Sequence, residues 1–214
     1  MQYSRGKHTD LLLTPFLVIA FVLGGCGGGI SSVRYYLVDP VAYSDVEAAT
    51  ATGLAVEILD VQVPQYLERF HIATRDAENQ LRFSENHQWG ENLRKNLLRT
   101  LAMNLSALLA TNDVSTPLNR SMSSPVYRIQ VHIEQFERDA DGVVKLVARW
   151  QISGIDISFP VTTHKAELTS GISIPEGDYD RLVAVMQDLF GRLSETIAAT
   201  VRSAGDGGVQ RIRI

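Results

Sequence analysis

Regular alternation of apolar and polar side chains over residues 126–136 (VYRIQVHIEQF) constrains the fold more than any other feature of the chain. Successive side chains of a strand point to opposite faces, so this segment predicts a strand with one face against a core and the other in water. The turn-forming residues 139–142 (DADG) lead into a second apolar run at residues 143–152, which predicts a hairpin. A third strand is expected over residues 157–169, giving an antiparallel meander.

Four further strands are expected nearer the N-terminus. Residues 33–38 (VRYYLV) are rich in β-forming residues and are followed by an Asp-Pro turn signal. Residues 54–63 (LAVEILDVQV) carry apolar side chains on both faces of a strand, which predicts a central strand covered on both sides. Short strands are expected at residues 71–75 and 80–83, because a turn-like segment separates them.

Apolar side chains recur at helical spacing over residues 88–110 and again over residues 179–201. This spacing places them along one side of a helix and predicts two long amphipathic helices. The predicted fold class is therefore α+β, with a mainly antiparallel sheet packed against two long amphipathic helices in a single domain. Trp89, Trp150 and Phe190 fall on the apolar stripes of their elements, which favours core positions over the lining of a lipid groove.

The only cysteine of the chain, Cys26, directly follows an apolar run. Arg5 and Lys7 precede residues 11–23 (LLLTPFLVIAFVL), which are too few to span a bilayer comfortably, and small residues follow them. These three parts predict an export signal. Residues 23–26 (LGGC) resemble the lipobox of bacterial lipoproteins, whose cysteine thiol receives a diacylglyceryl group and becomes the first residue after cleavage. The alternative is a buried free cysteine behind a false signal.

Lipidation of Cys26 divides the chain into a signal peptide (residues 1–25), a lipidated flexible linker (26–32), a folded domain (33–203) and a flexible C-terminal tail (204–214) that contains glycines. Two or three acyl chains such as palmitate, at about 0.8 kcal/mol per buried methylene, hold a protein permanently on a membrane. Gly27 stands where an aspartate usually retains lipoproteins in the inner membrane, which favours the outer membrane.

Charge and motif content argue against several functional classes. The chain has 20 Lys plus Arg against 24 Asp plus Glu, so its net charge of −4 gives no reason to expect a nucleic-acid partner. The four histidines after Cys26 lack the paired spacing common among metal ligands, and we expect neither a metal nor a cofactor. Residues 171–175 (GISIP) begin like a nucleophile elbow, but Pro175 replaces its closing glycine. We therefore expect no catalytic site.

Residues 63–96 (VPQYLERFHIATRDAENQLRFSENHQWGENLRKN), together with YYLVDP near residue 35, resemble the auxiliary lipoproteins of MCE-type transport systems. This family is also called the ABC-type transport auxiliary lipoprotein component. Its pattern is P-x-Y-L-D/E-R, a short gap, I-x-x-R, then an acidic residue ahead of R/Q-W-A-E-x-L. The matching residues here are Pro64, Tyr66, Leu67, Glu68, Arg69, Ile72, Arg75, Glu85, Trp89, Glu91 and Leu93. Phe70, Gly90 and Asn92 depart from it, and we expect these departures to loosen the first helical turn.

The resemblance implies a non-enzymatic lipoprotein on the periplasmic side of the outer membrane. Its implied partners are an MCE-domain protein that spans the periplasm, the outer-membrane lipids around Cys26, and further copies of itself in a ring. The alternative is an independent lipid-binding carrier. The family motif serves either a partner surface or the packing of strands against the helix. Arg69 and Arg75 are candidates for ion pairs with Glu68, Glu85 or a partner carboxylate. We favour a structural role for both, because an exposed charge on a strand needs no partner.

Overall fold

The computed structural model describes residues 32–43, 54–77, 79–120, 124–155 and 160–211, and of residues 205–211 it describes the backbone alone. The predicted signal peptide, Cys26 and almost all of the predicted linker lie outside the described residues. The elements are β1 (Arg34–Tyr36), β2 (Val56–Gln62), the short 3-10 helix η1 (Gln65–Glu68), β3 (His71–Ala77), β4 (Gln80–Trp89), α2 (Leu93–Leu108), β5 (Val114–Ser115), β6 (Tyr127–Arg138), β7 (Val143–Gly154), β8 (Thr162–Ser173) and α3 (Tyr179–Arg211).

The described strands form an eight-stranded sheet in the order β1-β4-β3-β6-β2-β5. Outside this order, β7 pairs with β6, and β8 pairs with β7. Antiparallel pairing joins β6 to β7 and β7 to β8, which confirms the predicted meander. The sheet is nevertheless mixed, so the prediction of a mainly antiparallel sheet is not confirmed: β2 runs parallel to both β5 and β6, and β1 runs parallel to β4. The chain between β2 and β6 includes α2, which provides the long crossover that parallel pairing needs. The α+β class is confirmed.

A bulge in β2 explains why its apolar residues do not cover both faces of the sheet. The register shifts between Ile58 and Asp60, so Ile58 and Val61 are both fully buried although they are three residues apart. Leu59 is 40% exposed. The expectation of a strand covered on both sides was therefore wrong, although β2 does lie inside the sheet, between β5 and β6.

Both helices differ from their predicted bounds. Trp89 ends β4, and α2 begins only at Leu93, because Asn92 caps the helix with its Oδ1 accepting from the Lys95 backbone N–H at 3.3 Å. Asparagine is a favourable cap, so Asn92 stabilises the first turn that it was expected to loosen. Helix α3 continues ten residues beyond the predicted end at Val201, and its backbone is helical through residues that we expected in a flexible tail.

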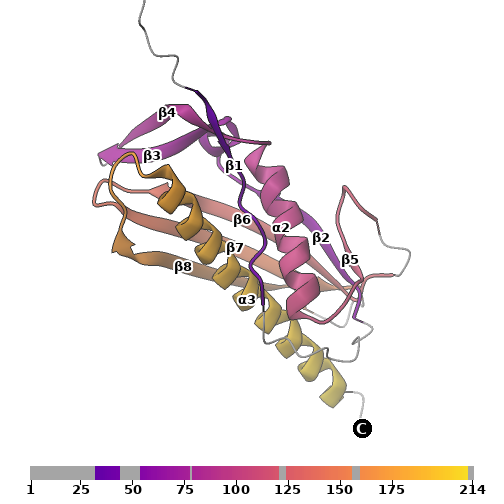
Figure 1. Cartoon of the computed structure of the whole chain (residues 1–214). Coiled ribbons are helices and arrows are strands. Elements are labelled where there is room, and N and C mark those ends of the chain that lie inside the picture. The colour runs from indigo at the N-terminus through magenta and orange to yellow at the C-terminus, as the bar shows by residue number, and fades with distance from the viewer. Residues whose placement is uncertain (1–31, 44–53, 78, 121–123, 156–159, 212–214) are drawn as a thin grey trace, which may run out of the picture. The chain divides into compact units, whose positions relative to one another are not determined.

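Both helices pack on one face of the sheet, and the core fills the space between these layers (Figure 1). Phe136 and Phe190 are fully buried there, while Trp89 and Trp150 are each 2% exposed. The indole N–H of Trp150 donates to Thr200 Oγ1 at 3.2 Å, which satisfies the polar end of a buried ring. Trp89, Trp150 and Phe190 are thus confirmed as core residues. Within the described residues, no helix combines the length and the apolar character needed to cross a membrane.

We expect Trp89→Ala to lower the free energy of unfolding by about 3 to 5 kcal/mol, because it removes a buried ring and leaves a cavity. Urea unfolding followed by circular dichroism measures this change. Met103→Ala is the matched control: its side chain is 53% exposed on α2, so the change should stay within about 0.5 kcal/mol. Equal stability of Trp89→Ala and the wild type would contradict a core role for the ring.

Candidate functional site

The chain that leads from the predicted lipid attachment site continues, after β1, into the space between α2 and α3 (Figure 1). We call residues 37–43 the anchor segment. Val38 is fully buried, and its backbone N–H donates to Asn96 Oδ1 at 2.8 Å. Its carbonyl oxygen accepts from Asn96 Nδ2 at 3.2 Å and from Thr100 Oγ1 at 2.7 Å. Side chains of α2 therefore replace the strand partner that this extended backbone lacks.

Contacts to both helices continue along the anchor segment. The Val41 N–H donates to Asn104 Oδ1 at 3.1 Å, and the Tyr43 hydroxyl donates to the Gly191 carbonyl at 3.3 Å. Gly191 allows this approach, because a Cβ there would lie 2.6 Å from Val41 Cγ2. Burial, assisted by the negative charge of Glu195, raises the pKa of Tyr43 to about 12, so its hydroxyl keeps its proton at neutral pH.

Three polar residues of α2 form a stripe at helical spacing beside the apolar stripe that faces the sheet. Asn96, Thr100 and Asn104 are each 1% exposed and succeed one another every four residues. Asn104 Nδ2 also donates to Ser194 Oγ of α3 at 3.0 Å. We did not predict this stripe, although a polar residue stands one position before each of Leu97, Leu101 and Leu105.

Motif residues meet at a second polar site, built around the carboxylate of Glu137 in β6. The Glu137 side chain is fully buried. Its Oε2 accepts from the Tyr66 hydroxyl at 2.7 Å, and its Oε1 accepts from Arg75 Nε and Nη2 at 3.1 and 2.9 Å. Gln135 Nε2 and the Phe136 N–H also donate to this carboxylate, each at 3.1 Å. A buried carboxylate needs such donors and a cation.

The Glu137 site changes the ionisation of its partners. Burial raises the pKa of Tyr66, and the hydrogen bond to the Glu137 carboxylate raises it further. The pKa of Arg75 is also raised, chiefly by its hydrogen bonds to Glu137. Tyr66 therefore stays neutral and Arg75 stays charged at physiological pH. Alternation gave no signal for Glu137, because the register of β6 shifts between Ile133 and Gln135: Phe136 continues the inward face of Ile129 and Val131, and Glu137 lies opposite Lys145 on the other face.

The remaining motif residues lie near this site but not in it. Leu67 and Ile72 belong to the core, and Pro64 immediately precedes η1. Arg69 is exposed, with its guanidinium carbon 4.7 Å from the centre of the Phe83 ring. The expected ion pairs with Glu68 or Glu85 were wrong for Arg75, whose carboxylate partner is Glu137. Glu85 is exposed on β4.

A cluster of polar and aromatic residues joins β1 and β4 to the first turn of α3. Arg34 pairs with Asp180 at 3.0 Å, and the Tyr36 hydroxyl donates to the same carboxylate at 2.9 Å. The His87 ring stacks on Tyr179 with 4.1 Å between ring centres. Burial and the Asp180 carboxylate raise the pKa of Tyr36, while its hydrogen bond holds the pKa of Asp180 below the ordinary value.

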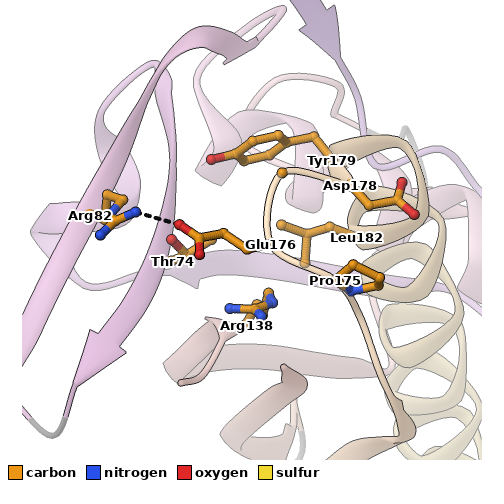
Figure 2. Close-up of a pocket in the computed structure, with 9 residues that line it drawn as sticks. Thr74, Arg82, Arg138, Pro175, Glu176, Asp178, Tyr179 and Leu182 are labelled. Atoms are coloured by element: carbon orange, nitrogen blue, oxygen red, sulfur yellow. Dashed lines mark hydrogen bonds and ion pairs between the residues drawn. The ribbon is translucent and has the colours of Figure 1, made fainter. Parts of the chain in front are cut away.

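Figure 2 shows a small pocket beside this cluster, where Arg82 of β4 reaches the Glu176 carboxylate across the pocket. Arg138 Nε donates to the Ile174 carbonyl at 2.7 Å. The cavity volume is about 20 Å³, which suits about one water molecule rather than a lipid. A larger hollow of about 230 Å³ on the outer face of the sheet is lined mainly by polar side chains: Gln62, Gln130, His132, Arg149, Gln151 and Thr163.

Hydrogen bonds engage each histidine of the described residues. Their partners are Gln88 for His71, Ser84 for His87, Gln62 for His132 and Thr162 for His164. Ser173, the serine of the elbow-like segment, donates to the Asp141 carbonyl at 2.9 Å and so links the end of β8 to the turn between β6 and β7. No group of three or more His, Cys, Asp or Glu side chains in the described segments is placed to hold a metal ion.

We expect Arg75→Ala to lower the free energy of unfolding by about 3 to 5 kcal/mol, because it leaves the Glu137 carboxylate buried without its cation. Adding Glu137→Leu should recover much of this loss, since the double variant buries no charge. The control is Arg128→Ala, which breaks the partly exposed Arg128–Glu57 pair and should cost about 1 kcal/mol or less. Chemical denaturation of five proteins measures these values: the wild type, Arg75→Ala, Glu137→Leu, the double variant and Arg128→Ala. Strictly additive effects of the Arg75 and Glu137 changes would contradict the coupling.

Comparison with known proteins connects this geometry to a family. The model of the ABC-type transport auxiliary lipoprotein component matches residues 35–198, which include the anchor segment and the Glu137 site. The intermembrane transport lipoprotein PqiC of Escherichia coli (strain K12) is 25% identical over 195 residues, which cover 86% of this chain and 95% of PqiC. PqiC of Shigella flexneri gives the same values.

Two solved structures share the fold. The crystal structure of an uncharacterized protein has a TM-score of 0.64 and 19% identity, and covers 79% of this chain and 99% of its own. The crystal structure of protein XCC0632 from Xanthomonas campestris has a TM-score of 0.64 and 11% identity, and covers 83% and 99% of the two chains. The family match spans most of the folded domain, and this chain therefore belongs to the ABC-type transport auxiliary lipoprotein component family.

Proposed function

We propose that this protein is an outer-membrane lipoprotein facing the periplasm and a non-enzymatic auxiliary subunit of an MCE-type intermembrane lipid transport system. In this role it docks a PqiB-like MCE-domain protein that spans the periplasm, and it supports envelope integrity. The observation that carries the proposal is the family match over residues 35–198. Similarity over 95% of PqiC, a protein named for intermembrane transport, supports it.

The anchor segment supports an adaptor that is mechanically coupled to its membrane anchor. Cys26 is proposed to carry the lipid, and the first strand begins only eight residues later, at Arg34. From there the backbone at Val38 and Val41 is bonded to side chains of α2. Because no long flexible segment follows β1, a force on the lipidated end would be transmitted through these hydrogen bonds to the packed core.

For the family motif we propose a folding role for its buried members and a partner-facing role for its exposed ones. Tyr66 and Arg75 hold the Glu137 carboxylate, while Leu67, Ile72 and Trp89 are buried. These side chains have little surface to offer a partner. Arg69 and Glu85 are exposed, so they are the motif residues that we expect a partner protein to contact.

The filled core favours the adaptor over the alternative, an independent lipid carrier. A carrier needs an apolar cavity large enough for acyl chains, usually between sheet and helices. In this protein Phe136, Trp150 and Phe190 occupy that space and are buried by their neighbours. We also propose that copies assemble into a ring, because β8 is a twelve-residue strand whose pairing partner among the described strands is β7, on one side.

Affinity purification of the lipidated protein from its native membranes in mild detergent tests the proposed function. We expect an MCE-domain protein in the eluate, recovered in a fixed ratio, because docking is a specific protein contact. Protein and lipid mass spectrometry of the same eluate measure both partners. Stoichiometric lipid without a protein partner would contradict docking and support the carrier.

Cys26→Ser is the matched control for this purification, since it removes the acylated thiol and leaves the folded domain unchanged. We expect this variant to be absent from the outer-membrane fraction and to fail to complement a deletion strain. Full complementation by the Cys26→Ser protein would contradict the anchoring part of the proposal, whatever the eluate contains.

A further inference from the structure

The face of the sheet opposite α2 and α3 contains a hollow of about 230 Å³. We call it the outer hollow. Its polar lining comes from four strands, and the adaptor role proposed above uses none of it. The polar lining residues are Gln62, Gln130, His132, Arg149, Gln151 and Thr163.

Strand register shows that one row of these residues forms a continuous surface. His132 of β6 lies opposite Gln62 of β2 on one side and opposite Arg149 of β7 on the other. The next residues along the strands, Val131 and Trp150, are buried in the core. Because successive side chains of a strand point to opposite faces, the row lies on the outer face.

A second row runs beside the first. Gln130 lies opposite Gln151, and Gln151 lies opposite Thr163 of β8. Gln130 and Gln151 are two residues from His132 and Arg149 along their strands, so both rows share the outer face. All three residues of the second row are exposed, and their amide and hydroxyl groups can donate to a ligand.

Among the residues that line the outer hollow, Arg149 is the one with a permanent charge, and no carboxylate lines it. Arg149 pairs through Nε with Glu134 at its border, and within the described part of the chain its terminal nitrogens form no hydrogen bond. Lys165 Nζ lies 3.9 Å from the second oxygen of the same carboxylate. Glu167 lies outside the lining, opposite Val147. Two cations therefore share Glu134, which leaves the hollow able to attract an anion.

The donors that remain match a phosphate group. A guanidinium binds phosphate oxygens through two parallel N–H groups, and neutral N–H and O–H donors complete such a site. His132 Nδ1 donates to Gln62 Oε1 at 3.1 Å, which leaves the amide N–H groups of Gln62 to donate. Pockets for drug-sized ligands measure about 300 to 1,000 Å³, so this hollow suits one small polar group.

We propose that the outer hollow binds a phosphate group, either inorganic or carried by a phospholipid headgroup, with Arg149 as its cation. The side chains of Gln62, Gln130, Gln151 and Thr163 supply neutral donors. This site lies on the outer face of the sheet, so it does not require a lipid cavity in the filled core. It also does not depend on the docking of a partner.

Nuclear magnetic resonance of the acylated, full-length protein in maltoside detergent and phosphate-free buffer tests the proposal. The probes are inorganic phosphate, dihexanoylphosphatidylglycerol and, as a neutral control, glucose. We expect the side-chain amide signals of Gln130 and Gln151 to shift and saturate with a phosphate-bearing probe but not with glucose. Equal affinities for the two phosphate probes would show recognition of phosphate alone, and tighter binding of the phospholipid would identify the headgroup as the ligand.

Three variants separate a specific site from general attraction to positive charge. We expect Arg149→Gln to weaken binding by about tenfold, because it removes a charge-assisted hydrogen bond. Glu134→Gln should strengthen binding several-fold, since it removes the carboxylate that competes for Arg149. The control is Arg128→Gln, which changes an exposed arginine of the same face that pairs with Glu57 and does not line the hollow, and it should leave the affinity within about twofold.

Shifts that do not saturate with either phosphate probe would overturn the inference. Equal weakening by Arg149→Gln and Arg128→Gln would overturn it as well, because the attraction would then be diffuse. Unchanged or weaker binding in Glu134→Gln, or saturable binding of glucose at the same amides, would contradict the assignment of an anion to this hollow. The Glu134→Gln result keeps the test decisive if Arg149→Gln does not fold.

Discussion

The hydrogen bonds between the Asn96 side chain and the backbone of Val38 make it possible to bury the anchor segment between α2 and α3. An extended backbone buried between two helices would leave its N–H and C=O groups without partners, at a cost of about 1 to 3 kcal/mol for each group. Asn96, Thr100 and Asn104 supply these partners from one side of α2. The leucines beside them bury the adjacent side of the helix against the sheet, so α2 joins the anchor segment to the core.

The Glu137 carboxylate also connects distant segments, at another part of the sheet. Tyr66 comes from η1, Arg75 from β3 and Glu137 from β6, so one buried ion-pair network connects segments with more than sixty residues of chain between them. Burying a charged group is unfavourable unless its partners are in place, and this gives the network a strong geometric requirement. The Glu137 network and the core together account for the family pattern, because Tyr66 and Arg75 hold the Glu137 carboxylate and Trp89 is buried in the core.

Sequence patterns predicted the local elements well and the long-range pairings poorly. The β6 to β8 meander could be predicted because alternating apolar and polar residues mark each strand and turn residues join β6 to β7. The parallel pairing of β2 with β6 depends on the path of the whole chain, which no local pattern indicates. Trp89 was assigned to the helix because it continues the four-residue spacing of Leu93 and Leu97, although it ends a strand. The bulge in β2 shifts the phase of its apolar residues, and no residue type marks it. Glu137 and Asn96 were missed because polar residues in an amphipathic pattern are usually on the water side.

The proposed docking of a periplasm-spanning protein requires that the folded domain keep a defined position on the membrane. The anchor segment meets this need if its backbone is as firmly held as the sheet. Hydrogen exchange of the Val38 and Val41 amides in the full-length protein measures that directly. Our account predicts that both amides exchange as slowly as the amides of β6, opening only when the core unfolds. Rapid exchange at Val38 and Val41 while β6 remains protected would show that the anchor segment moves independently, and would contradict the account.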